Sequence, residues 1–136
     1  MGQTKAQRLI SMVDALRRLM LLGYYSIQVD AKPFLHEDGT EGSGACHAQP
    51  EYLDATLNLN PQRIPKEDEI PIVAHELAHI LVWKLAAAAQ ARAKTKAELK
   101  DLRDMEEELT TCIERIVCVL LDVKVSDVKR SGCVRR

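Results

Sequence analysis

Residues 70–82 of this 136-residue chain read Ile70-Pro71-Ile72-Val73-Ala74-His75-Glu76-Leu77-Ala78-His79-Ile80-Leu81-Val82, and this apolar stretch decides how the remainder is interpreted. It contains the pattern His-Glu-x-x-His in a sequence that favours helix. Because His75 and His79 are four residues apart, both imidazoles lie on one helix face, where two ring nitrogens can bind a single Zn²⁺. The opposite face carries the stripe that we expect to be buried, which comprises Val73, Leu77, Ile80 and Leu81.

Glu76 lies beside the two histidines and has a different predicted task. Its carboxylate can accept a proton from a metal-bound water without being a ligand, and the metal lowers the pKa of that water toward neutrality. A helix whose two histidines bind no metal is the alternative, and the apolar setting disfavours it. The three residues predict a catalytic zinc site whose activated water attacks a carbonyl group.

A zinc site with two histidines needs a third protein ligand, and a catalytic site leaves the fourth position to water. Residues 96–122 predict a helix whose inward stripe we expect at Leu109, Cys112, Ile113, Ile116, Val117 and Leu120. One turn before this stripe lies Glu106, which is the predicted third ligand. Glu107 is the alternative, because an error of one residue in helix phase exchanges the two.

The helix of residues 67–92 and that of residues 96–122 are expected to be separate and antiparallel. In one straight helix, His79 and Glu106 would lie about 40 Å apart. The sequence Thr95-Lys96-Ala97-Glu98 has the form of a capping box, which marks the start of a new helix. The break is therefore predicted where the metal site requires it.

The part of the chain before residue 67 predicts one helix and three short strands. Apolar residues recur at helical spacing over residues 4–22, and the strands are expected at residues 24–30, 45–52 and 55–61. In the last of these, Leu57 and Leu59 point to one face, while Thr56, Asn58 and Asn60 point to the other.

Composition excludes several classes of protein. With 19 Lys plus Arg against 20 Asp plus Glu, the formal net charge is −1, so nucleic-acid binding by bulk electrostatics is not expected. No uncharged apolar run reaches the roughly 18 residues of a membrane span, and basic residues interrupt any signal core near the N-terminus. We expect one domain over residues 1–136, with a basic tail at 122–136, in the cytoplasm and with free cysteine thiols.

The chain resembles the zincin metallopeptidases, specifically the gluzincin branch, whose ligands are the two motif histidines and a Glu on a following helix. The likeness is closest to minigluzincin-like and ImmA/IrrE-type metallopeptidases and to the small zincin-like proteins of phages and prophages. The family's later element maps onto Glu106, Leu109, Cys112, Ile113, Ile116 and Val117. Leu109 and Thr110 depart from it, because the family has a small residue and Asn there.

The resemblance implies a minimal zincin-like α+β fold. Its order is an N-terminal helix, a three-stranded sheet with an edge strand over the cleft, an active-site helix and an antiparallel glutamate helix. Residues 55–60 resemble the edge strand, which pairs with an extended peptide substrate. The candidates for a donor that stabilises the oxyanion are Tyr24, Tyr25, Tyr52 and His47.

The expected function is a zinc-dependent endopeptidase that cuts an extended segment of a protein partner. The alternative is a noncatalytic zincin-like module, in which zinc holds two helices together and the protein acts by binding. A fourth protein ligand on the metal would favour that alternative. The sequence indicates neither the peptide bond that is cut nor the oligomeric state.

Overall fold

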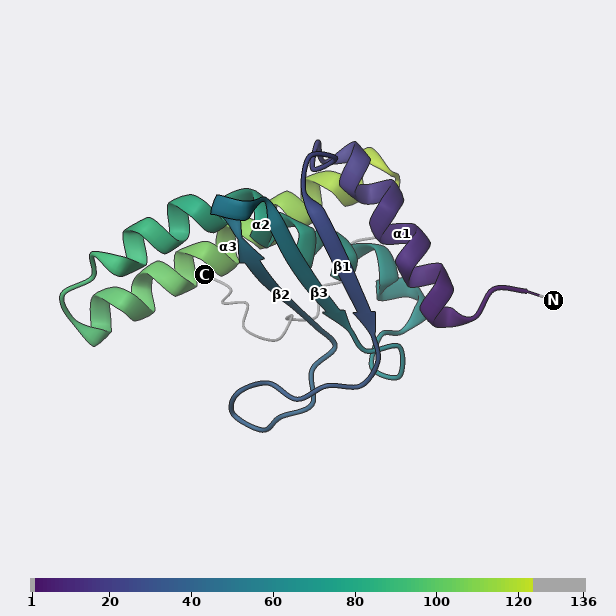
Figure 1. Ribbon diagram of the computed structural model, residues 1–136, viewed down its shortest axis with the longest axis horizontal. Helices are drawn as coiled ribbons and strands as arrows, with labels where there is room; N and C mark the ends of the chain where they lie inside the picture. The colour runs from purple at the N-terminus through teal and green to yellow at the C-terminus, as the bar shows by residue number, and fades with distance from the viewer. Residues whose placement is uncertain (1, 124–136) are drawn as a thin grey trace.

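The computed structural model describes residues 2–123 (Figure 1). The predicted basic tail, beyond its first two residues, lies outside the described residues. The elements, in chain order, are α1 (Lys5–Leu19), β1 (Ser26–Ala31), β2 (Gly44–Gln49), β3 (Asp54–Leu59), α2 (Glu69–Ala91) and α3 (Lys96–Leu120). Short 3-10 turns occupy Pro50–Tyr52 and Lys66–Asp68. The predicted mixed α+β architecture, with three helices and a small three-stranded sheet, is confirmed.

The strand order of the sheet is β1-β3-β2, with β1 parallel and β2 antiparallel to β3. The expectation that residues 55–60 form the edge strand is therefore wrong, since β3 pairs with a neighbour on each side. Alternation of apolar and polar residues reports which face of a strand is buried, and it carries no information about the strand's place in the sheet. The strand that borders the cavity described below is β2.

One face of the sheet is covered by helices, and the other carries polar side chains. Leu57 and Leu59 are fully buried toward the helices, as predicted, while Thr56 and Asn58 are half-buried. Asn60 is also fully buried, contrary to the prediction. Its side chain donates to Glu41 Oε1 at 3.3 Å and accepts from the backbone N–H of Gln62 at 3.0 Å, so both ends of the amide are satisfied inside the fold.

α2 is the central helix of the protein. By length and composition the segment Lys66–Ala91 could cross a membrane. Its most apolar stretch of 18 residues has a mean hydropathy of 1.4, yet 56% of that stretch is buried inside this protein. It packs against α1, the sheet and α3. Arg8 of α1 donates to both carboxylate oxygens of Glu69 in the first turn of α2, at 3.0 and 2.6 Å, and thereby fixes one end of this core helix.

The predicted break between the last two helices is confirmed, and α2 and α3 run side by side beyond the sheet (Figure 1). The Thr95 hydroxyl accepts from the backbone N–H of Glu98 at 3.0 Å, as a capping residue does. The Glu98 carboxylate accepts from the N–H of Lys94 at 2.6 Å, one residue earlier than a capping box requires. The turn is thus fixed by one half of the predicted motif.

The predicted phase of α3 is wrong by one residue. Leu109, Cys112, Ile116 and Leu120 are exposed, and the buried residues of the helix are Thr110, Glu114, Val117 and Cys118. Two of the four buried side chains are polar, so hydrophobicity alone selected the wrong face.

Candidate metal centre

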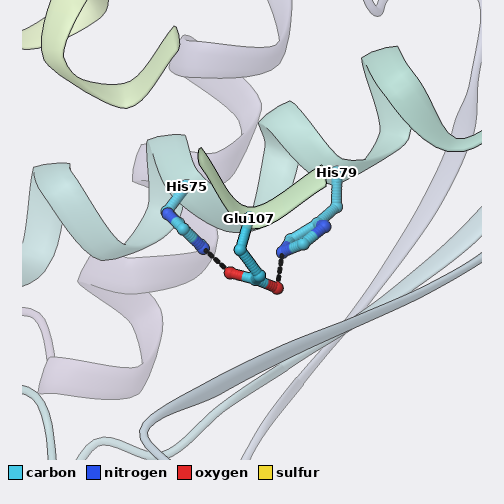
Figure 2. Close-up of side chains that lie close together, drawn as sticks. All are labelled: His75, His79 and Glu107. Carbon is cyan, nitrogen blue, oxygen red and sulfur yellow. Dashed lines mark hydrogen bonds and ion pairs between the residues drawn. The ribbon is translucent and has the colours of Figure 1, made fainter. Parts of the chain in front are cut away.

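Three side chains from two helices meet at one point in the protein. His75 and His79 come from α2 and Glu107 from α3, and their ligand atoms all lie within 4.8 Å of one another. Figure 2 shows the Glu107 carboxylate between the two imidazole rings, 3.2 Å from His75 Nε2 and 3.2 Å from His79 Nε2. Two imidazole nitrogens and one carboxylate oxygen are a ligand set typical of catalytic zinc sites.

Glu106, the predicted third ligand, lies beside this group and contacts the ring nitrogen of His79 that does not face Glu107. Its Oε2 lies 2.7 Å from His79 Nδ1, and its Oε1 accepts from Gln90 Nε2 at 2.8 Å. The structure therefore brings Glu107, the sequence-based alternative, into the group of three and gives Glu106 the ring nitrogen on the far side of His79. The corrected phase of α3 explains the exchange, because residues 107, 110, 114 and 117 form its inward line.

Glu114 is a residue of the site that the sequence analysis missed. It is 2% exposed, and its Oε1 lies 3.2 Å from His75 Nδ1. Each histidine thus presents Nε2 to Glu107 and Nδ1 to a separate carboxylate. Carboxylates commonly hold metal-binding histidines in this way, fixing the ring and its tautomer. Glu114 could have been identified from its position seven residues after Glu107, because this spacing places both side chains on the same helix face.

The titration of these groups follows from their pairing. Burial acts to lower the pKa of His79, but its hydrogen bonds to Glu106 and Glu107 prevail and raise it to about 9. Burial acts to raise the pKa of Glu107, but the two histidines prevail and lower it to about 2. The hydrogen bond to His79 lowers the pKa of Glu106.

Glu76 lies in the same cavity, directly under the sheet edge. It is 8% exposed, and burial raises the pKa of its carboxyl, although His79 and His75 oppose this shift. A Cβ atom on Gly44 of β2 would lie 3.1 Å from Glu76 Cγ and 3.3 Å from its Oε1. Glycine at the start of β2 therefore allows the strand to pass close over the Glu76 carboxylate.

A cavity of about 640 Å³ opens onto the group. β2 contributes Gly44, Ala45 and Cys46 to its lining, and the β1–β2 loop contributes His36. α2 contributes Trp83 to the lining, and α3 contributes Arg103, which lies one turn before Glu107. None of the four residues proposed as oxyanion donors, Tyr24, Tyr25, Tyr52 and His47, is among its lining residues. His36 and Arg103, which do line it, are two of the side chains there that can donate a hydrogen bond.

The residues of the site suit a zinc ion. Both imidazoles are buried, each is braced through Nδ1, and the carboxylate that completes the set is held by both rings. Cys46 faces the same cavity but does not belong to the group of three, and burial raises the pKa of its thiol well above the usual range. The result is a site that could bind a metal ion through two nitrogen ligands and one oxygen ligand, all three from the protein.

Comparisons of the chain with protein-family models, with curated proteins and with solved structures give no match. Function is therefore inferred from the chemistry of the site.

Proposed function

We propose that this protein is a zinc-dependent endopeptidase of the gluzincin type. His75, His79 and Glu107 hold the zinc ion, and Glu76 is the general base. The observation that carries the proposal is the meeting of two imidazoles and a carboxylate from separate helices, with a further buried carboxylate in the same cavity. Three ligands from protein leave a position for water or substrate, which is the arrangement of catalytic zinc.

The chain's own residues then have distinct roles. Zinc supplies Lewis-acid activation of water and of the substrate carbonyl. Glu76 accepts the proton of the attacking water and later delivers it to the leaving amine. Glu114 and Glu106 hold His75 and His79 in position, and Arg103 and His36 can donate to the carbonyl oxygen as negative charge develops on it.

The substrate class follows from the strand at the cavity border. In the described part of the sheet, β2 pairs with β3 alone, so its other edge has backbone groups available for an extended peptide. Such pairing gives affinity through the main chain. Because Gly44, Ala45 and Cys46 line the cavity, a peptide added to β2 would pass over Glu76.

The test combines metal content with hydrolysis. Native mass spectrometry should find one zinc ion per chain, and the zinc-loaded protein should cut members of a quenched peptide library. Glu76→Gln should retain zinc and lose hydrolysis, because it keeps the shape of the side chain and removes the proton acceptor. Glu67→Gln, on the exposed turn before α2, is the matched control and should retain both.

Full zinc occupancy with a fourth protein ligand, and no hydrolysis by the unaltered protein, would instead support the noncatalytic module. X-ray absorption at the zinc edge counts the ligands directly. Hydrolysis that survives Glu76→Gln would refute the mechanism, whatever the metal content.

A further inference from the structure

α3 carries an exposed apolar stripe, and the first half of this stripe borders α2. The stripe follows alternating steps of three and four residues, through Leu102, Met105, Leu109, Cys112, Ile116 and Val119. Leu102 is half-buried and Cys112 exposed, while the other four side chains are between 46% and 72% exposed. Leu109, Cys112 and Ile116 of this stripe belong to the set that hydrophobicity had assigned to the core, and the described structure leaves all three exposed.

The surface continues onto α2. Leu81 and Leu85 are exposed there, and an apolar hollow of about 140 Å³ lies between the two helices. Its lining comprises Val82, Leu85, Ala86, Ala89, Leu102, Met105, Glu106 and Leu109. Large contiguous apolar surfaces of this kind mark interaction sites.

We propose that the apolar stripe of α3 binds the same stripe of a second copy of this chain, antiparallel and related by a two-fold axis. Steps of three and four are the spacing with which two α-helices pack along their length. A two-fold interface uses one patch on both partners, so a single self-complementary stripe suffices. In this register Leu109 lies against the partner's Cys112, Met105 against the partner's Ile116, and Leu102 against the partner's Val119.

The charges beside the stripe favour this occupant and this direction. Glu108 and Arg115 are both exposed, lie on the same border of the stripe and are seven residues apart. In the antiparallel register each Glu108 faces the partner's Arg115, which gives two symmetric ion pairs near the axis. Parallel helices would instead place Glu108 beside the partner's Ile113 and leave the charges unmatched.

The ends of the stripe carry acidic residues. Asp101 and Asp122, which follows the end of α3, are both exposed, so solvent and salt screen the like charges that this register brings near each other. The acidic residues Asp101 and Glu108 along the border disfavour an anionic lipid surface as the occupant.

Analytical ultracentrifugation of the full chain over a range of concentrations tests the proposal. The unaltered protein should show a monomer–dimer equilibrium, and Leu109→Glu should shift it to monomer. Because Leu109 is exposed, the circular dichroism spectrum of this variant should match that of the unaltered protein. Tyr52→Glu, at another exposed large side chain away from α3, is the control and should still dimerise. A single monomeric species at every concentration overturns the proposal, as does a dimer that Leu109→Glu leaves intact.

A charge exchange tests the register. Glu108→Arg alone, or Arg115→Glu alone, places like charges together and should raise the dimer Kd by about ten-fold. The double variant restores opposite charges and should recover the original Kd. A double variant no tighter than either single variant, or vesicle binding in place of self-association, contradicts the antiparallel dimer. Leu109→Cys should also form an interchain disulfide with the partner's Cys112 on mild oxidation, visible on a non-reducing gel.

Discussion

At the scale of single residues, the site depends on which of two adjacent glutamates points inward. Successive residues of an α-helix differ by about 100° in direction, so Glu106 and Glu107 cannot serve the same purpose. Glu107 reaches both Nε2 atoms, whereas Glu106 reaches His79 Nδ1 and Gln90. Their substitution should therefore have unequal effects.

Glu107→Ala is expected to abolish stoichiometric zinc binding, because it removes one of three protein ligands. Glu106→Ala should weaken affinity by about 10- to 100-fold, the usual effect of losing a carboxylate that braces a ligand histidine. Zinc competition with a chelating dye measures both. The reverse order of effects would show that Glu106 is the ligand.

Glu114→Gln is expected to weaken zinc affinity by about 10- to 100-fold as well, since it removes the carboxylate charge that lies 3.2 Å from His75 Nδ1. The d–d absorption spectrum of the cobalt-substituted protein should shift, a change that a loss of stability alone does not produce. The exposed Glu108→Gln on the same helix is the control. An unchanged spectrum and affinity would remove Glu114 from the site.

At the scale of an element, glycine at residue 44 leaves the room in which the edge strand β2 passes close to α2. Gly44→Ala places a Cβ against Glu76 Cγ and Ile72 Cγ2, at 3.1 and 3.2 Å, so the Glu76 side chain must move. Hydrolysis should fall by about ten-fold or more while zinc content is kept, because the ligands lie on α2 and α3. Gly23→Ala, where nothing lies within 4 Å, is the matched control. Equal activity of the two variants would show that the approach of β2 is not needed.

At the scale of the whole molecule, α1 is joined to the core helix through the pair of Arg8 and Glu69. The hydrogen bond from Arg8 holds the pKa of the Glu69 carboxyl below its ordinary value of 4.5. A carboxyl whose pKa is lowered in the folded state contributes stability above its unfolded pKa. That contribution is lost as the pH falls through the folded value.

Arg8→Ala should accordingly lower the melting temperature at about pH 7, and the difference from the unaltered protein should shrink below about pH 4. Thermal melts followed by circular dichroism at several pH values measure it. Arg18→Ala, which removes the exposed pair with Asp14, should have little effect at any pH. A difference for Arg8→Ala that does not depend on pH would assign its role to packing alone.

The sequence by itself determined the local features of this protein. The spacing of His75 and His79 placed both rings on one helix face, and Thr95 marked the start of α3. The alternation in β3 identified the buried faces of Leu57 and Leu59. Each of these depends on residues within about one helical turn or one strand, where spacing and chemistry suffice.

Only the tertiary structure decided the remainder. Thr110 and Glu114 are polar yet buried. The Thr110 hydroxyl donates to the Glu107 carbonyl and Glu114 lies 3.2 Å from His75, so no hydrophobic pattern could place α3 in its true phase. The central position of β3 depends on its parallel pairing with β1, which lies far away along the chain and on the side of β3 opposite its sequence neighbour β2. Whether Glu106 or Glu107 meets the histidines, and which strand borders the cavity, are set by contacts between elements, and these are formed by the fold as a whole.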